Sequence, residues 1–221
     1  MRRNPPEAVL FDLDGTLLNT LDDLADSMNA VLADEGLPTA PAEDHRFMIG
    51  DGVLNYVLRA LPEDRRDDRA LVDRIREAYR VRYAAAWRNT THLYDGVIAM
   101  LAGLRQRGLR LAVLSNKPDG FTRDMVSHFL GGVPFEIVRG ATDGVPLKPD
   151  PAAAVAIAER MDVPAADFLY LGDTATDMRT ARTAGMFAVG ALWGFRPRAE
   201  LADAGAQALI TRPTDLLTYA A

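Results

Sequence analysis

The sequence predicts an α/β fold: a Rossmann-like, doubly wound parallel sheet that is interrupted by an inserted all-helical domain. Two observations lead to this prediction. Short apolar runs alternate with helical patterns through most of the chain, whereas the segment from about residue 21 to residue 92 has helical patterns and no convincing strand. With 221 residues, the chain is long enough for one large domain or two smaller ones, and it can bury a core.

The expected strands are apolar runs without polar alternation. A half-exposed antiparallel strand would alternate, so these runs are typical of a parallel sheet that helices cover on both faces. The expected strands are Ala8–Phe11, Leu109–Ser115, Phe135–Gly140, Phe168–Gly172 and Phe187–Leu192. Several of the helical stretches between them end in glycine, a frequent signal of a helix C-terminus. This β–α alternation favours right-handed crossovers in one sheet.

The helical segment after the first strand is too long to be a crossover. We therefore expect a second, all-helical domain over residues 19–92, inserted into a core domain formed by residues 1–18 and 93–221. Thr20 precedes the first helical stretch and Asp23 follows within its first turn, which resembles a capping box with aspartate in place of glutamate.

Composition excludes several classes of protein. A formal net charge of -6 provides no positive field to attract nucleic acid. The absence of cysteine excludes disulfides, thiolate metal sites and cysteine nucleophiles. The apolar run near the N-terminus stops at Asp12, too early for a signal peptide, and no run is long enough to cross a membrane. We expect a cytoplasmic protein with neither a nucleic-acid nor a membrane partner.

Polar side chains gather where the expected strands end. In a parallel α/β sheet, ligands bind at the carboxyl ends of the strands, so residues that are far apart in sequence meet at one edge. Lys148 lies in a loop just before a helix, and the other candidates follow or end a strand or open a helix. The candidates are Asp12 and Asp14, Ser115 and Asn116, Lys148, and Asp173 with Asp177.

These residue types indicate phosphoryl-transfer chemistry. Clustered carboxylates need a cation, and oxygen ligands without cysteine point to Mg²⁺. A lysine ammonium and a serine hydroxyl beside a metal ion form a cradle for phosphate. A carboxylate can also attack phosphorus and form an aspartyl-phosphate. Phosphoryl transfer depends mainly on positioning and charge neutralisation, and these residue types can supply both.

At this point the chain resembles the haloacid dehalogenase-like (HAD) phosphohydrolase superfamily. The similarity extends from about residue 7 to residue 195 and covers motifs that occur in the family's order. The motifs are DLDGTL (Asp12–Leu17), LSN (Leu114–Asn116), Lys148 in LKPDP, and GDTATD (Gly172–Asp177). In this family the insert between the first and second motifs is a helical C1-type cap.

The resemblance implies a catalytic role for the first motif. Asp12 would be the nucleophile and a Mg²⁺ ligand. Asp14 would bind Mg²⁺ through its main-chain oxygen and would act as general acid, then as general base. Asp173 would complete the metal site, and Asp177 would support it through water or through Lys148.

The resemblance also implies which residues bind the substrate. Thr16, Ser115 and Lys148 would hold the phosphoryl group, and Asn116 is assigned to the same site. The partner would be a small phosphorylated metabolite, and the protein would be a monomer or a homodimer.

Within the superfamily, the chain is most similar to the phosphoglycolate phosphatase branch. The segments that carry this similarity are Ser115–Pro118, Leu192–Leu201 and Phe47–Leu61. The last of these contains a glycine-punctuated loop, Gly50-Asp51-Gly52, which would be the specificity loop of the cap. Asparagine is more usual than Asp51 at that position, and a carboxylate facing the leaving group would repel an acidic substrate.

Lys117 and Lys148 are the only lysines in a chain whose other basic residues are arginines. Lysine offers a compact charge where arginine offers a wide planar fork, so both positions invite a functional explanation. Lys117 neighbours the expected phosphate cradle. Trp193 and Phe195, in a loop after a strand end, are either packing residues or a platform for the substrate.

Other functions share parts of this pattern. A sugar-phosphate mutase of the same superfamily has all of the motifs and differs chiefly in its cap. A dehalogenase attacks through aspartate but needs neither Mg²⁺ nor Asp14. A non-enzymatic phospho-acceptor receiver module also clusters aspartates and a lysine on an α/β sheet, although the helical insert and Asp14 disfavour it.

Overall fold

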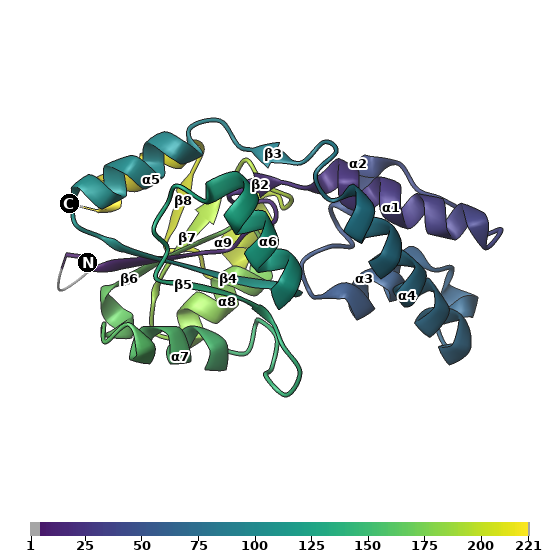
Figure 1. The fold of residues 1–221 in the computed structure, drawn as a ribbon. Helices are drawn as coiled ribbons and strands as arrows, with labels where there is room; N and C mark the ends of the chain where they lie inside the picture. The colour runs from purple at the N-terminus through teal and green to yellow at the C-terminus, as the bar shows by residue number, and fades with distance from the viewer. Residues whose placement is uncertain (1–4, 221) are drawn as a thin grey trace. The chain divides into compact units, whose positions relative to one another are not determined.

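The computed structural model describes residues 5–220, which divide into two compact units (Figure 1). One unit contains the described residues up to Asn19 together with those from Leu93 onward, and the other is Thr20–His92. The short strands β2 (Leu18–Asn19) and β3 (His92–Leu93) pair with each other where the chain passes between the units.

The first unit is built on a six-stranded sheet with the strand order β5-β4-β1-β6-β7-β8. Every neighbouring pair of strands is parallel. The strands are β1 (Ala8–Phe11), β4 (Arg110–Pro118), β5 (Ile137–Ala141), β6 (Phe168–Gly172), β7 (Phe187–Ala191) and β8 (Ala208–Ile210). This arrangement, with helices on both faces, confirms the predicted Rossmann-like α/β class.

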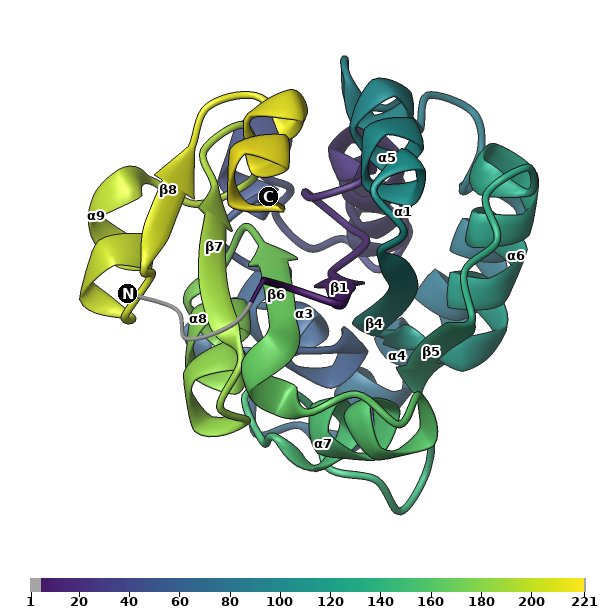
Figure 2. The same cartoon turned by 90° about the vertical axis from the view of Figure 1, so that its left-hand side faces the viewer.

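Helices cover the sheet on both sides. Figure 2 shows α7 and α8 on one side of the strands, and α5 with the C-terminal 3₁₀ helix η3 on the other. The helical elements are α5 (Val97–Gln106), α6 (Asp119–Leu130), α7 (Ala152–Arg160), η2 (Ala165–Asp167), α8 (Ala175–Thr183), α9 (Arg198–Asp203) and η3 (Pro213–Tyr219). Strand side chains point alternately to the two faces, so the continuous apolar runs supply both layers of the core.

The core on the α7–α8 side illustrates this alternation. Leu10, Ala112 and Tyr170 are neighbours across β1, β4 and β6, and they pack with buried residues of α7 and α8. Their chain neighbours Val9 and Phe11 are equally buried. Since both faces are buried, the register depends on how the individual side chains pack with the helices on each face.

The strand boundaries differ from the predicted ones at several points. β4 continues to Pro118, so Ser115 lies inside the strand and not at its end, and Asn116 lies inside it and not after it. The pairing of β4 with β5 shifts between Leu114 and Pro118, and this irregularity lets the strand extend through polar residues. β8 was not predicted, because three residues provide too little periodicity to recognise.

The second unit consists of helices and the loops that join them, and His92, at the start of β3, is its one strand residue. Its elements are α1 (Leu21–Asp34), α2 (Ala42–His45), α3 (Val53–Ala60), η1 (Glu63–Arg65) and α4 (Arg69–Ala86). α4 packs against both α1 and α3. Tyr56 and Tyr79 meet edge to face, and Tyr79 stacks on Tyr83, so aromatic side chains form much of this small core.

The predicted capping box at Thr20 is wrong. The Thr20 side chain makes no cap hydrogen bond, and the Asp23 carboxylate, the other half of the predicted box, binds elsewhere. Asp23 Oδ1 accepts hydrogen bonds from the backbone N–H and hydroxyl of Thr90, and Oδ2 accepts them from those of Thr91. Asp23 therefore ties the first helix of this unit to the segment that leaves it.

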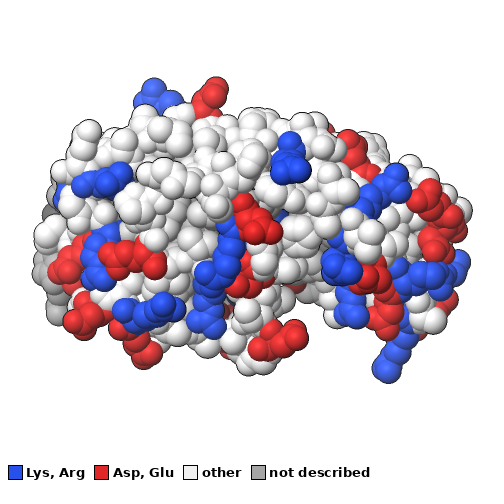
Figure 3. All heavy atoms as spheres, in the orientation of Figure 1, with Lys and Arg blue, Asp and Glu red and all other residues white. Residues whose placement is uncertain are grey.

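Charges of opposite sign are interleaved on the surface. On the face drawn in Figure 3, basic and acidic side chains lie side by side and do not gather in a large patch of one sign. Along α4, Arg76 pairs with Asp73 and Arg80 pairs with Glu77. Across residues 5–220, no helix combines the length and apolarity needed to cross a membrane.

Candidate active site

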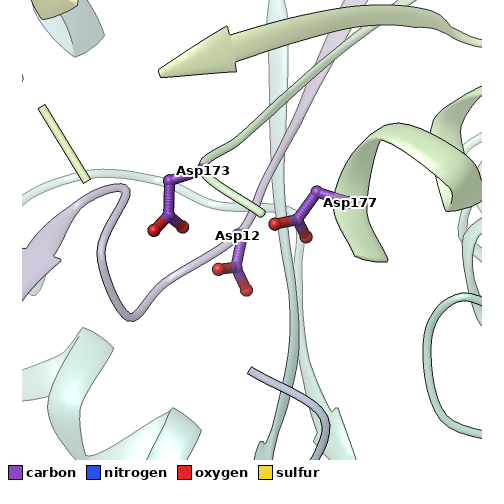
Figure 4. Close-up of side chains that lie close together, drawn as sticks. All are labelled: Asp12, Asp173 and Asp177. Atoms are coloured by element: carbon purple, nitrogen blue, oxygen red, sulfur yellow. The ribbon is translucent and has the colours of Figure 1, made fainter. Parts of the chain in front are cut away.

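Three carboxylates from different elements meet at the carboxyl end of the sheet. Asp12 directly follows β1, Asp173 directly follows β6, and Asp177 lies in the first turn of α8. One oxygen of each lies within 4.8 Å of those of the other two, and all three residues are buried. Figure 4 shows their carboxylates turned toward one another. Because β1 and β6 are adjacent and parallel in register, the sheet itself brings Asp12 and Asp173 together.

Asp173 is held on both oxygens. The Thr16 hydroxyl donates to Oδ1 at 2.9 Å, and the backbone N–H of Phe195 donates to Oδ2 at 2.8 Å. Two glycines allow the surrounding chain to come this close. A Cβ atom on Gly15 would lie 2.2 Å from Asp173 Oδ2, and one on Gly194 would lie 2.3 Å from Asp173 Cβ. The site therefore needs glycine at both positions.

The loop after β7 contributes more than packing. Besides the Phe195 N–H, the indole N–H of Trp193 donates to the main-chain oxygen of Thr16 at 3.0 Å. The sequence predicts either packing groups or a substrate platform at these two positions. In the structure they fix the turn after β1 and the carboxylate of Asp173.

Asp177 is positioned by the start of α8. Thr174 and Asp177 form a capping box: Asp177 Oδ2 accepts from the Thr174 backbone N–H and hydroxyl, and the Asp177 N–H donates back to the Thr174 hydroxyl oxygen. Gly172 is required here, since its Cβ would lie 2.3 Å from Asp177 Cβ. Asp177 Oδ1 accepts from Lys148, so both oxygens have donors.

Lys148 is the cation at the centre of the cluster. Its ammonium donates to Asp12 Oδ1 and Asp177 Oδ1, both at 2.7 Å, and to the main-chain oxygen of Leu114 at 3.1 Å. Asn116 holds the backbone of Lys148: its side-chain amide donates to the Lys148 carbonyl, and its oxygen accepts the Lys148 N–H, both at 2.9 Å. Asn116 thus contacts the lysine of the predicted substrate site directly.

A second ion pair lies beside this cluster. The Lys117 ammonium contacts Asp14 Oδ1 at 3.0 Å and Oδ2 at 3.1 Å. Ser115, on the same strand, accepts the Lys117 backbone N–H on its hydroxyl oxygen at 3.1 Å. The Asp14 carboxylate therefore belongs to a separate pair, outside the group formed by Asp12, Asp173 and Asp177.

Burial controls the ionisation of this site. Burial raises the pKa of Asp12 well above its usual range, although the nearby Lys148 charge acts against this. Burial and then the charge of Asp177 raise the pKa of Asp173 to about 7, against the hydrogen bonds from Phe195 and Thr16. Burial lowers the pKa of Lys148. The charges of Asp12 and Asp177 raise this pKa by more than burial lowers it, so it lies well above its usual value. The cluster thus contains more negative charge than its lysine balances.

The structure places the remaining candidates in the helical unit. Gly50 and Gly52 both adopt positive φ angles, 123° and 88°, which favour glycine. Between them, the carboxylate of Asp51 pairs with the guanidinium of Arg59, which also donates to the Met48 carbonyl at 3.0 Å. Asp51 is therefore charge-balanced within its own unit.

Some parts of the site were not predicted from the sequence. They are the Lys117–Asp14 pair, the Asn116 clamp on Lys148, and the contact of the 193–195 loop with Asp173. The scarcity of lysine was the one available signal for Lys117. Gly194 carried no such signal, because a close approach of two chain segments depends on tertiary structure.

Known proteins match this chain over most of its length. The model of the haloacid dehalogenase-like hydrolase family matches residues 9–191. The phosphoglycolate phosphatase of Pseudomonas syringae pv. tomato is 34% identical over 201 residues, covering 88% of this chain and 74% of that protein. The phosphoglycolate phosphatase of Rhodospirillum rubrum is 34% identical over 210 residues, covering 92% of this chain and 86% of that protein.

A solved structure extends the match to three dimensions. The crystal structure of a predicted phosphoglycolate phosphatase from Haemophilus somnus aligns with a TM-score of 0.90 at 26% identity, covering 98% of each chain.

The fold, the motifs and these matches together define a hydrolase of the α/β class, and the chain belongs to the haloacid dehalogenase-like hydrolase family. Within that family it is a phosphatase, a phosphoric monoester hydrolase similar to phosphoglycolate phosphatases. The prediction of the superfamily and of an enzyme is confirmed. Phosphatases of this family act on small phosphorylated substrates and generally use a divalent metal, and the acidic cluster here is suited to one.

Proposed function

We propose that this enzyme hydrolyses 2-phosphoglycolate or a closely similar small phosphomonoester, in the cytoplasm, with Mg²⁺ and through an aspartyl-phosphate at Asp12. The observation that carries the proposal is the position of Asp12. Its carboxylate is buried at the end of the central strand, oriented by Lys148, and faced by Asp173 and Asp177. The similarity to phosphoglycolate phosphatases supports the choice of substrate.

The residues divide the reaction into two steps. In the first, a carboxylate oxygen of Asp12 bonds to phosphorus while the bond from phosphorus to the ester oxygen breaks, and Asp14 gives its proton to the leaving oxygen. In the second, Asp14 takes a proton from water, whose oxygen bonds to phosphorus and releases Asp12 and inorganic phosphate. One group acting as acid and then as base restores the enzyme after each turnover. Thr16, Ser115 and Lys148 would hold the phosphoryl oxygens.

The donor set fits a hard divalent cation. It contains only oxygen ligands, and the pKa of Asp173, about 7, reflects buried negative charge that a cation would balance. Asp12, Asp173 and the main-chain oxygen of Asp14 would hold Mg²⁺. Asp177 is already paired with the Lys148 ammonium, whereas Asp173 accepts only from the neutral donors of Thr16 and Phe195, so Asp177 would support the site and not bind directly. When bound, Mg²⁺ would supply charge stabilisation to the phosphoryl group.

We assign substrate selection to the helical domain, residues 19–92, acting as the cap of the core domain formed by residues 1–18 and 93–221. The glycine-flanked loop at Gly50-Asp51-Gly52 is its specificity element in this proposal. Pairing with Arg59 offsets part of the Asp51 charge, which reduces the repulsion that its carboxylate would exert on an acidic substrate.

A panel of phosphate esters tests the proposal. Purified protein is assayed against 2-phosphoglycolate, sugar phosphates and nucleotides, with Mg²⁺ and with EDTA. We expect release of inorganic phosphate from 2-phosphoglycolate, dependent on Mg²⁺. Conversion of one sugar phosphate into an isomer without phosphate release would favour the mutase alternative. Size-exclusion chromatography of the same purified protein distinguishes a monomer from a homodimer.

We predict that Mg²⁺ stabilises the protein more as pH rises to about 7. In the metal-free fold the raised pKa of Asp173 stabilises the protonated carboxyl, and this contribution is lost as pH rises through about 7. A bound cation replaces the proton, so its effect on Tm should grow over that range and then level off. Tm is measured with Mg²⁺ and with EDTA between about pH 5 and pH 8. Asp173→Asn should show little effect of Mg²⁺ at any pH, and a wild-type effect that does not vary with pH would contradict the assignment.

We also predict that Gly194→Ala weakens Mg²⁺ binding by about 10-fold or more, as losses around metal ligands commonly do. The new Cβ would lie 2.3 Å from Asp173 Cβ and 2.4 Å from the Gly15 carbonyl oxygen, so the carboxylate must move. The measurement is the Mg²⁺ concentration that gives half-maximal activity. Gly120→Ala is the matched control, because nothing lies within 4 Å of its added Cβ. Equal Mg²⁺ dependence in both variants would show that Asp173 tolerates the shift.

A further inference from the structure

Lys117 presents a cation to both oxygens of a carboxylate. Its ammonium lies 3.0 Å and 3.1 Å from the two oxygens of Asp14, so it donates to both at nearly the same distance. The Lys117 side chain is 5% exposed and that of Asp14 is 13% exposed, so water screens the pair only weakly. In such a weakly screened place the charge of an ammonium attracts a carboxylate group strongly.

The other lysine is already committed to the nucleophile. The Lys148 ammonium donates to Asp12, to Asp177 and to the Leu114 carbonyl, which together use the three N–H donors of a lysine. It is therefore placed to serve the nucleophile and the phosphoryl group. Lys117 is the lysine that contacts the proposed acid, Asp14, and not the proposed nucleophile.

The backbone around Lys117 is fixed. Its N–H donates to the Ser115 hydroxyl, and its carbonyl accepts the Thr122 hydroxyl, both at 3.1 Å. Gly140 on β5 allows this packing, since a Cβ there would lie 2.6 Å from the Lys117 carbonyl oxygen. The position of the Lys117 backbone, from which the side chain extends, is thus set by β4, β5 and the start of α6.

We propose that Lys117 determines substrate specificity by binding a carboxylate of the substrate, which makes short phosphorylated acids the preferred substrates. The inference rests on the proposed function, because that function places the leaving oxygen of the substrate beside Asp14. The carboxylate of 2-phosphoglycolate is separated from this oxygen by a single methylene. It therefore falls within reach of the ammonium that contacts Asp14.

Electrostatics gives the reason for such a residue. In the proposed first step Asp14 carries the proton that it gives to the leaving oxygen, so the negative charge that pairs with Lys117 in this structure is absent at that stage. The substrate carboxylate then supplies this charge, and Lys117 exchanges part of its contact with Asp14 for contact with the substrate. A neutral leaving group offers the ammonium no such exchange. Hydrogen bonds between charged groups are the stronger ones, so the acid gains relative to a neutral ester of the same size.

The test compares two esters that differ in charge and not in length: 2-phosphoglycolate and 2-hydroxyethyl phosphate. For each, kcat and KM are measured in the wild type, Lys117→Met, Lys117→Arg and the control Arg123→Met. Arg123 is an exposed cation on the same unit, paired with Asp119. We expect Lys117→Met to lower the ratio of the two kcat/KM values by about 10- to 100-fold, mainly through a higher KM for the acid. Lys117→Arg should retain most of the ratio, and Arg123→Met should retain all of it.

Other results would overturn the inference. If Lys117→Met slows both esters by the same factor, Lys117 only orients Asp14 or supports β4. If the wild type shows no preference for the acid, the inference fails while the proposed hydrolysis stands. If the wild type hydrolyses neither ester, the proposed function fails. Calorimetric binding of the two esters to Asp12→Asn, with and without Lys117→Met, then decides the inference separately: the acid must bind more tightly, and Lys117→Met must remove that difference.

Discussion

Asp12→Asn is expected to abolish turnover, with a loss in kcat of at least about 10⁴-fold. The amide has the shape of the carboxylate but cannot form the bond to phosphorus. The fold should survive the change, because the substitution removes a buried negative charge beside Asp173 and Asp177. Lys148 keeps its contacts with Asp177 and with the Leu114 carbonyl. Tm should therefore stay equal to that of the wild type or rise.

The measurement is kcat on 2-phosphoglycolate with Mg²⁺, together with Tm. Mass spectrometry after an acid quench should find one phosphoryl group on the wild type, at Asp12, and none on the variant. Asp203→Asn is the matched control, since Asp203 is exposed on α9 and distant in sequence from every motif. Retention of a tenth of the wild-type activity by Asp12→Asn would place the nucleophile at another residue.

The fold was predictable because its signals are local. Ala8–Phe11 and Phe168–Gly172 are continuous apolar runs, and both were predicted with the bounds that the structure has. Each is followed at once by aspartate, so a parallel sheet necessarily brings Asp12 and Asp173 to the same edge. The turn chemistry around Asp177 was equally local, since its partner Thr174 is in the same motif.

The rest of the site depends on contacts that no local pattern encodes. Lys117 reaches Asp14 from a neighbouring strand, which requires β4 to continue past Ser115 with an irregular register. Asp23 was interpreted as a capping residue because Thr20 is near in sequence, but its carboxylate binds Thr90 and Thr91. In both cases a partner distant in sequence decides where a charged side chain lies, and tertiary structure overrides the local preference.

Lys148→Met is expected to reduce both activity and stability. The substitution leaves Asp12 and Asp177 buried without the ammonium that now lies 2.7 Å from each. Removing one partner of a buried ion pair typically costs about 3–5 kcal/mol, which for a chain of this size corresponds to a fall in Tm of about 10 °C. The loss of stability should be smaller at lower pH, because the two carboxylates that lack the ammonium can then take up protons. It should also shrink with Mg²⁺, which supplies positive charge to the same cluster.

Lys148→Arg separates charge from shape. The guanidinium keeps the positive charge, yet its planar fork cannot point at Asp12, Asp177 and the Leu114 carbonyl from one position as the ammonium does. We therefore expect Lys148→Arg to regain part of the stability but to lose nearly as much kcat as Lys148→Met. Lys117→Arg should be milder, because the Asp14 carboxylate that Lys117 contacts is partly exposed. Measuring kcat and Tm for all three variants tests this. Equal activity in the two arginine variants would mean that only the charge of Lys148 matters, and the fixed position of its ammonium would then have no catalytic role.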